Sequence, residues 1–174
     1  MNKLILSIPL IIILIICTFL FIFLIQNKDP NKPPSALLDE QLPKFEMVDL
    51  FDKKQTLSNF DLNNKTILIN FFASWCAPCK AEHPLLFEIK KNKNNTFIVG
   101  INHKDKKIDA LKYLEDDGNP YDYVGIDKDG LVGLEFGVFG LPETFIINSK
   151  GKIVFKHTGP LTKEIIYDEI TKLF

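Results

Sequence analysis

The sequence predicts an α/β domain, with a central mixed sheet flanked by helices, behind one N-terminal transmembrane helix. Apolar runs typical of buried strands alternate with segments of helical period through residues 41–174. The last two apolar runs are joined by a short turn, which adds an antiparallel hairpin to the sheet. The chain also begins with a long apolar segment that carries no charge after Lys3.

The apolar segment covers residues 4–25, which as a helix can cross a hydrocarbon core of about 30 Å. A cleaved signal peptide is the alternative, but its apolar region is usually only about 7–15 residues long and ends in a small-residue cleavage pattern. Cys17 suggests a lipoprotein, yet Ile16 precedes it instead of a small residue. We therefore expect a membrane anchor at residues 1–26, with Cys17 as a small hydrophobic side chain in lipid.

Charges around the anchor predict its orientation. Lys3 and the terminal amine precede it, whereas Lys28 after it is offset by Asp29, which gives a weak positive-inside bias. The folded part is then expected outside the cytoplasm, where disulfides can persist. Residues 27–40 are polar and proline-rich and indicate a linker, and residues 41–174 form the domain.

Local patterns predict the elements of the domain. A run at 66–72 indicates a buried central strand, and the helix after it is expected to begin at the cysteine pair and to kink at Pro84. The other expected elements are a hairpin of 45–50 with 55–57, a strand at 96–101, a helix from a cap at Asp105 through Leu114, a strand around 124–126, a hairpin of 144–147 with 153–155, and a helix at 162–174.

Composition excludes several classes of function. A net charge of -1 gives no electrostatic case for nucleic-acid binding. All 21 basic residues are lysine, so the chain lacks the arginine that usually activates a peroxidatic cysteine, which disfavours a peroxidase. Only 3 cysteines are present, too few for a framework of several disulfides.

Cys76 and Cys79 carry the predicted chemistry. Two thiols at this spacing close a small ring and can exchange a disulfide with another molecule, provided that the first is exposed and partly ionised. Cys76 is expected at a helix N-terminus, where amide groups and the helix dipole lower its pKa below about 8.5. We therefore predict Cys76 as nucleophile and Cys79 as resolving thiol. The alternative, that both are inert thiols of the core, is disfavoured because Trp75 and Pro78 frame the pair. Pro78 also restricts the loop between the two cysteines.

Two motifs carry a family resemblance. The stretch WCAPCK at 75–80, with Pro142 before a later strand, resembles the thioredoxin superfamily over nearly the whole of 41–174, which implies a thioredoxin-like fold. The continuation AEH at 81–83 and GVFGLPETF at 137–145 resembles the narrower DsbE/CcmG branch of membrane-tethered thiol:disulfide interchange proteins. Leu141 departs from that pattern, because a smaller residue is common there.

The resemblance implies a thiol-disulfide oxidoreductase that acts as a reductant in cytochrome c maturation. Its substrate would be a disulfide of apocytochrome c or of a maturation partner, and a membrane electron-donor thiol reductase would re-reduce it. The implied location is the bacterial inner membrane, single-pass, with the C-terminal domain in the periplasm. No cofactor is expected: a zinc site needs more ligands, and c-type haem attachment needs histidine where Lys80 stands.

Glu82 is the candidate proton acceptor. It follows Cys79 by three residues, so the two side chains point to similar sides of a helix. Spacing alone favours an exposed carboxylate, whereas the resemblance favours a catalytic role. Asn70 occupies the strand position at which a typical cytoplasmic thioredoxin carries a buried aspartate, so Glu82 is the expected substitute.

The substrate-binding set comprises Trp75, Pro78, Leu141, Pro142 and Glu143. Most X-Pro bonds are trans, but the resemblance implies a cis bond at Pro142, which leaves the Leu141 backbone free to pair with an extended substrate. Glu143 is expected to act as a second acid that disfavours the thiolate, with an exposed strand-entry acid as its alternative.

Two other functions stay open at this point. The first is a reductase of periplasmic disulfides in general or of a copper-site assembly protein. The second is a metal or haem chaperone that uses the same thiols as ligands without redox turnover. His83, His103 and His157 are spread along the chain and receive no catalytic role.

Overall fold

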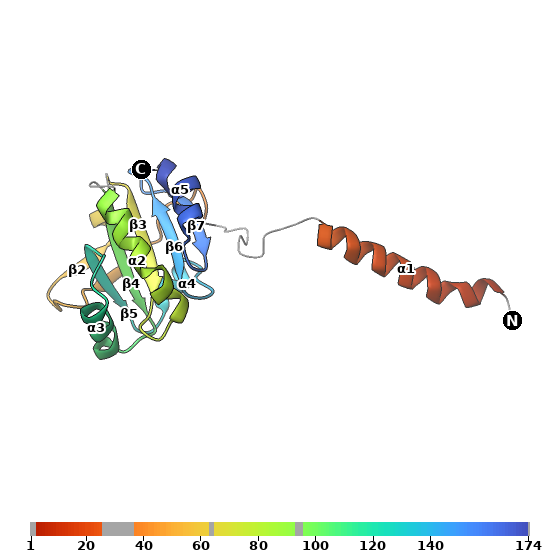
Figure 1. The fold of residues 1–174 in the computed structure, drawn as a ribbon, viewed down its shortest axis with the longest axis horizontal. Helices are drawn as coiled ribbons and strands as arrows, with labels where there is room; N and C mark the ends of the chain where they lie inside the picture. The colour runs from red at the N-terminus through yellow and green to blue at the C-terminus, as the bar shows by residue number, and fades with distance from the viewer. Residues whose placement is uncertain (1–2, 26–36, 63–64, 93–95, 174) are drawn as a thin grey trace. The chain divides into compact units, whose positions relative to one another are not determined.

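The computed structural model describes residues 3–25, 37–62, 65–92 and 96–173 and divides the chain into two units, 1–33 and 34–174. The first unit holds α1 (Lys3–Ile25), whose side chains are described over residues 8–22 (Figure 1). Among the described residues, no helix is long and apolar enough to cross a membrane. The predicted anchor is therefore not confirmed, and most of the predicted linker lies outside the described residues.

The second unit is built on one mixed sheet of five strands in the order β5-β4-β3-β6-β7. The strands β3, β4 and β5 run parallel, and β6 and β7 are antiparallel to their neighbours. Their bounds are Ile67–Phe72 for β3, Phe97–His103 for β4, Tyr123–Asp127 for β5, Glu143–Ile147 for β6 and Ile153–Thr158 for β7. The predicted central strand and second hairpin are confirmed.

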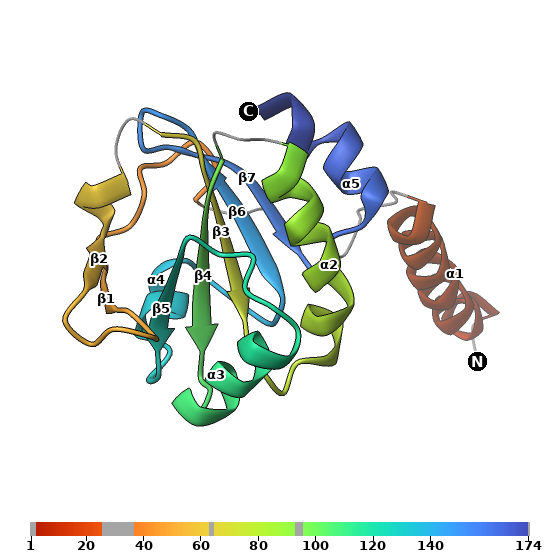
Figure 2. The same ribbon diagram turned by 60° about the vertical axis from the view of Figure 1, so that its left-hand side comes forward.

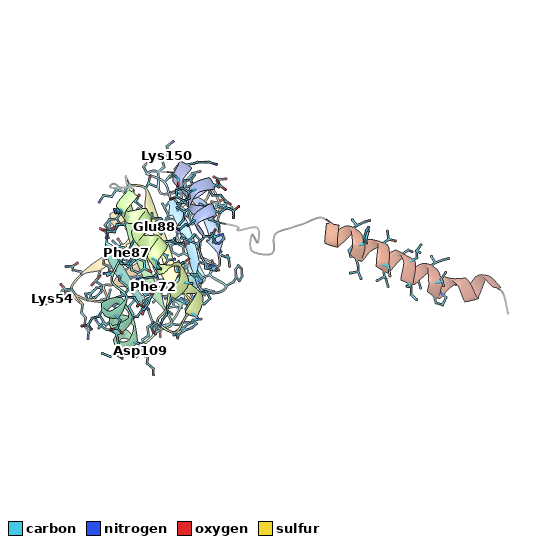
Figure 3. All side chains as sticks on the ribbon, viewed as in Figure 1. Lys54, Phe72, Phe87, Glu88, Asp109 and Lys150 are labelled. Atoms are coloured by element: carbon cyan, nitrogen blue, oxygen red, sulfur yellow. A yellow bond between two sulfur atoms is a disulfide. The ribbon has the colours of Figure 1, made fainter. Side chains whose placement is uncertain are left out.

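Packed layers cover both faces of the sheet, which is why every residue of β3 is buried (Figure 2). Leu68 and Phe72 face a layer of α2 (Ala77–Asn92), α3 (Lys107–Asp116) and α5 (Lys163–Asp168). The opposite face packs against β1 (Glu46–Val48), β2 (Thr56–Ser58), the 3-10 helix η1 (Asn59–Leu62) and α4 (Leu131–Glu135). Figure 3 shows Phe72 inside the body, with Lys54, Asp109 and Lys150 at its periphery.

Three expectations of the sequence need correction. Asp105 does not cap α3, whose N-cap is Lys106 without a side-chain hydrogen bond, because the Asp105 carboxylate accepts hydrogen bonds from Ser74 instead. The closing helix is divided into α5, capped by Thr162, and the 3-10 helix η2 (Ile170–Leu173). The elements α4 and η1 were not predicted, since 5 and 4 residues are too few to show an apolar period.

Candidate active site

A disulfide joins Cys76 and Cys79 at the N-terminus of α2, with sulfurs 2.00 Å apart. The backbone amide of Cys79 donates a hydrogen bond to Sγ of Cys76 at 3.2 Å. Such a donor at a helix N-terminus favours a thiolate once the bond is reduced. In this oxidised form Cys76 and Cys79 are only 4% and 2% exposed, whereas Trp75 beside Cys76 is 63% exposed. The exposure that disulfide exchange requires of the first thiol is therefore not seen in the oxidised form.

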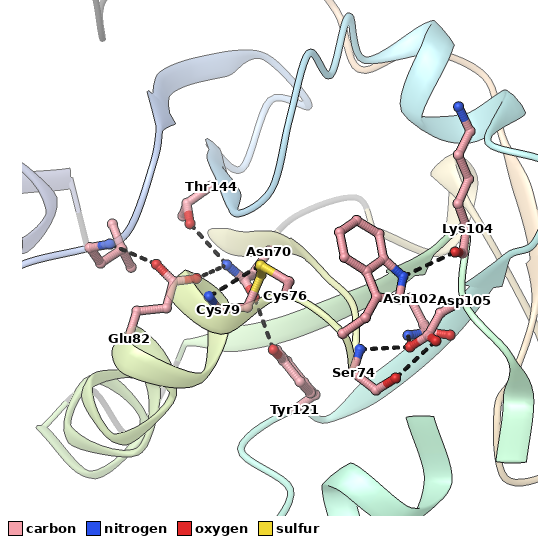
Figure 4. The surroundings of a disulfide bond; sticks show 12 residues. Asn70, Ser74, Cys76, Cys79, Glu82, Asn102, Lys104, Asp105, Tyr121 and Thr144 are labelled. Atoms are coloured by element: carbon pink, nitrogen blue, oxygen red, sulfur yellow. Dashed lines mark hydrogen bonds between the residues drawn. A yellow bond between two sulfur atoms is a disulfide. The ribbon is translucent and has the colours of Figure 1, made fainter. Parts of the chain in front are cut away.

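The turn before Cys76 is held by the segment that follows β4. The Asp105 carboxylate accepts from the backbone amide and the hydroxyl of Ser74 at 2.6 and 2.9 Å, and Trp75 Nε1 donates to the Lys104 carbonyl at 3.2 Å (Figure 4). Parallel strands β3 and β4 end at the same edge of the sheet, which brings these loops together. An acid two residues after the end of β4 was the sequence signal that could have indicated this contact.

Glu82 is buried in the same region, with 1% exposure. Its Oε1 accepts from Asn70 Nδ2 at 2.8 Å, and its Oε2 accepts from the Leu161 backbone amide at 2.6 Å (Figure 4). Burial raises the pKa of Glu82 to about 7, although both hydrogen bonds act to lower it. The alternative of an exposed carboxylate is therefore wrong, and a pKa near neutrality suits a group that takes and returns protons.

Asn70 connects Glu82 to β6 and to the segment before β5. It lies in the middle of β3, opposite Thr144 of β6, and is fully buried. Its Nδ2 also donates to Thr144 Oγ1 at 3.1 Å, and its Oδ1 accepts from the Tyr121 hydroxyl at 2.9 Å. The sequence indicated that an asparagine stands here in place of a buried aspartate, but it did not indicate Thr144 or Tyr121 as its partners.

The Leu141-Pro142 peptide bond is cis, as predicted. Pro142 is buried directly before β6, and Leu141 is half-buried and packs against residues of both cores. The carbonyl of Pro142 accepts from the Gly159 amide at 2.9 Å. The role of Leu141 and Pro142 in substrate binding stays a prediction.

Glu143 is fully buried, so the alternative of an exposed acid is wrong. Its Oε2 lies 3.1 Å from the Lys156 ammonium, and its Oε1 accepts from the Phe139 amide at 2.8 Å. Lys156 also donates to the Gly137 carbonyl at 2.8 Å and lies over the Phe139 ring at 5.2 Å. The Lys156 ammonium offsets the negative charge of Glu143 that was expected to disfavour the thiolate. The contacts of Glu143 and Lys156 also fasten the loop before Pro142. The sequence did not indicate this role of Lys156.

The histidines have structural surroundings. Burial lowers the pKa of His83, whose Nε2 lies 3.0 Å from the Gly118 carbonyl. His103 Nδ1 pairs with the Asp127 carboxylate at 2.6 Å. In the part of the chain that the structure describes, no group of three or more histidine, cysteine, aspartate or glutamate side chains can hold a metal ion.

A Cys-x-x-Cys disulfide at a helix N-terminus and a cis-proline at the start of β6, on a five-stranded mixed sheet, define the class of thioredoxin-like disulfide proteins. The family model Redoxin matches residues 38–171. The chain belongs to the Redoxin family. Its cysteine pair and its relatives identify the enzyme class as thiol-disulfide oxidoreductase.

Similar proteins carry names of the same kind. The chain is 41% identical over 157 residues to the probable thiol:disulfide interchange protein DsbE-2 of Pasteurella multocida, covering 90% of this chain and 81% of that protein. It is 38% identical over 152 residues to the thiol:disulfide interchange protein HelX of Rhodobacter capsulatus, covering 87% and 85%. A crystal structure of a putative DsbE from Chlorobium tepidum is similar with a TM-score of 0.69 and 25% identity, covering 78% and 96%.

Replacing Lys156 with methionine should lower the free energy of unfolding by roughly 3–5 kcal/mol, because it leaves the Glu143 carboxylate buried without its cation. Denaturant unfolding of the full chain in detergent measures this change. Lys163→Met is the control, since its side chain is 68% exposed and its ammonium lies 3.6 Å from the Glu88 carboxylate. That variant should lose no more than about 1 kcal/mol. Equal losses in the two variants would contradict the assignment of Lys156 as a buried counter-ion.

Proposed function

We propose that this oxidoreductase works in the reducing direction on disulfides of apocytochrome c, or of a partner in cytochrome c maturation. The observation that carries the proposal is the Cys76–Cys79 disulfide at the N-terminus of α2, beside the buried Glu82. The motif GVFGLPETF at 137–145 supports the specialised branch, because it resembles the DsbE/CcmG pattern.

The first step begins from the reduced protein. The Cys76 thiolate attacks one sulfur of the substrate disulfide, that S–S bond breaks, and the other substrate sulfur leaves as a thiolate. A mixed disulfide now joins Cys76 to the substrate. The Cys79 amide, which lies 3.2 Å from Cys76 Sγ in the oxidised form, stabilises the attacking thiolate.

The second step releases the substrate. Cys79 loses its proton, attacks Cys76 Sγ and restores the disulfide, while the second substrate sulfur leaves. Glu82 takes that proton and passes it on through water to a departing thiolate. Two electrons and the proton of Cys79 therefore move from the protein to the substrate, and the other substrate thiolate takes its proton from solvent. A membrane thiol reductase then returns the protein to its dithiol form.

The substrate is held by residues around the disulfide. Trp75 and Pro78 are exposed beside the cysteines and offer an apolar surface. The Leu141 backbone, before the cis bond to Pro142, pairs with an extended substrate segment as an added strand would. Glu143 contributes indirectly, because its contacts with Lys156 and the Phe139 amide shape the loop that presents Leu141.

The location rests on the sequence. The uncharged residues 4–25 are long enough for a single-pass anchor, and Lys3 before them favours a domain outside the cytoplasm. We place the anchor in the inner membrane of a bacterium and residues 41–174 in the periplasm. An oxidising compartment explains why a reductant there requires a membrane electron donor.

Expression of Cys79→Ser in cells should trap mixed disulfides on Cys76, because no resolving thiol remains to release the substrate. Purification of the full chain under non-reducing conditions, followed by mass spectrometry, identifies the captured proteins. We expect apocytochrome c or a maturation component. The double variant Cys76→Ser with Cys79→Ser is the control and should capture neither. Recovery of unrelated secreted proteins alone would point to a general reductase and contradict the specific assignment.

The Glu82→Gln variant should slow the second step by about 10²-fold near pH 8, since it removes the proton acceptor. The assay mixes the reduced full chain in detergent with one equivalent of the disulfide dithiobis(nitrobenzoate) in a stopped-flow instrument. All proteins carry Cys17→Ser, which removes the free cysteine. Attack by Cys76 releases the first thionitrobenzoate, and attack by Cys79 releases the second.

The wild-type rate of the second release should rise with pH around a midpoint near 7, the pKa that burial gives Glu82. The carboxylate is the active form, so the rate falls as pH drops below that midpoint and Glu82 becomes protonated. In Glu82→Gln this inflection should be absent. Identical profiles in the two proteins would remove Glu82 from the mechanism.

A further inference from the structure

Tyr121 lies buried next to the proton acceptor and has no part in the two exchange steps above. Its hydroxyl donates to Asn70 Oδ1 at 2.9 Å, and Asn70 Nδ2 donates in turn to Glu82 Oε1 at 2.8 Å (Figure 4). We propose that Tyr121 is a positioning residue whose hydroxyl fixes the orientation of the Asn70 amide and thereby sets the pH at which Glu82 takes the proton of Cys79. This inference rests on the proposed role of Glu82.

The amide of Asn70 has two orientations, which exchange its oxygen and its nitrogen. In the observed one, Nδ2 donates to Glu82 and Thr144 while Oδ1 accepts from Tyr121. In the reversed one, Oδ1 would face the Glu82 oxygen, and two acceptors would meet unless the carboxyl group carried a proton. The orientation of the amide and the protonation of Glu82 are therefore coupled.

The Tyr121 ring is held so that its hydroxyl stays on Asn70. The ring stacks on Phe72 with centroids 4.9 Å apart and an angle of 18° between the planes. The ring also packs closely against Gly100, because a Cβ atom added there would lie 2.8 Å from it. A residue with a side chain at position 100 would therefore displace the Tyr121 ring. The Tyr121 backbone amide is also fixed, by Asn119 Oδ1 at 3.0 Å.

Burial raises the pKa of Tyr121 well above its usual value, so the hydroxyl remains a donor throughout the working pH range. Tyr113 of α3 also interacts electrostatically with Glu82, and burial likewise raises its pKa. His83 follows Glu82 on α2, and burial lowers its pKa, which keeps it neutral near pH 7. Asp117 acts electrostatically on both Tyr113 and His83.

The Leu161 amide and Thr144 supply the remaining polar contacts of this set. Leu161 donates to the other Glu82 oxygen, Oε2, at 2.6 Å. Thr144 Oγ1 carries a hydroxyl that can donate as well as accept, so it can serve either orientation of the amide. The Tyr121 hydroxyl could likewise accept from a reversed amide, but its own buried proton would then lose Oδ1, the acceptor that it has in the observed orientation. Leaving that donor unpaired is costly, so Tyr121 favours the observed orientation.

Tyr121→Phe tests the inference because it removes only the hydroxyl. In the stopped-flow assay, the midpoint of the second release should rise by about half to one pH unit, since the freed amide can reverse and favour protonated Glu82. The rate above this midpoint should match that of the wild type. Tyr113→Phe is the matched control: its hydroxyl is buried with no hydrogen-bond partner among the described residues, and its ring also packs on Phe72, with centroids 6.0 Å apart. Its midpoint should stay unchanged.

Glu82→Gln, measured beside these variants, separates the two proposals. An inflection that disappears in Glu82→Gln but keeps its wild-type midpoint in Tyr121→Phe overturns the role of Tyr121 alone. Equal shifts in Tyr121→Phe and Tyr113→Phe also overturn it, because they indicate a general effect of ring polarity. A profile that Glu82→Gln leaves unchanged removes the role of Glu82 and this inference with it.

A measurement on the unsubstituted side chains covers the case in which Tyr121→Phe does not fold. The side-chain ¹⁵N–¹H resonances of Asn70 in the full chain should shift with pH at the same midpoint as the second release, because the amide donates to Glu82. Resonances that do not move through this range overturn the coupling between Asn70 and Glu82.

Discussion

The Glu82 carboxylate meets the Asn70 amide and the Leu161 amide in the core, with hydrogen bonds of 2.8 and 2.6 Å. An ionised carboxylate is costly to bury without such donors. Two donors lower that cost without removing it, so the pKa settles at about 7 and the group can exist in both forms near neutrality. The proposed proton transfer from Cys79 depends on this balance.

The same contacts tie together distant parts of the chain. Asn70 stands on the central strand, Glu82 on the helix that begins after Cys76, and Leu161 just before α5. The loops on either side of the site are fastened separately, by Asp105 to Ser74 and by Lys156 to Glu143. These contacts fasten the turn before Cys76 and the loop before Pro142 independently of the contacts of Glu82.

Local patterns made the fold and much of the site predictable. The apolar run of β3 and the spacing of Cys76 and Cys79 placed the disulfide at the start of α2, and the three-residue step to Glu82 placed that carboxylate near it. Long-range contacts were not predictable, since Leu161 lies 79 residues from Glu82 and Tyr121 lies 51 residues from Asn70. No periodicity in one sequence indicates which side chains meet across a core, so the contact of Asp105 with Ser74 and that of Lys156 with Glu143 cannot be predicted from it.

The central claim is that Glu82 is a buried acid that titrates near neutrality. The most direct test follows the side-chain carboxyl carbon of Glu82 by ¹³C NMR through a pH titration of the oxidised full chain in detergent micelles, with the Glu82→Gln spectrum to assign the resonance. A midpoint near 7 is the expected result. A midpoint near 4.5, the ordinary value for a glutamate, would contradict it.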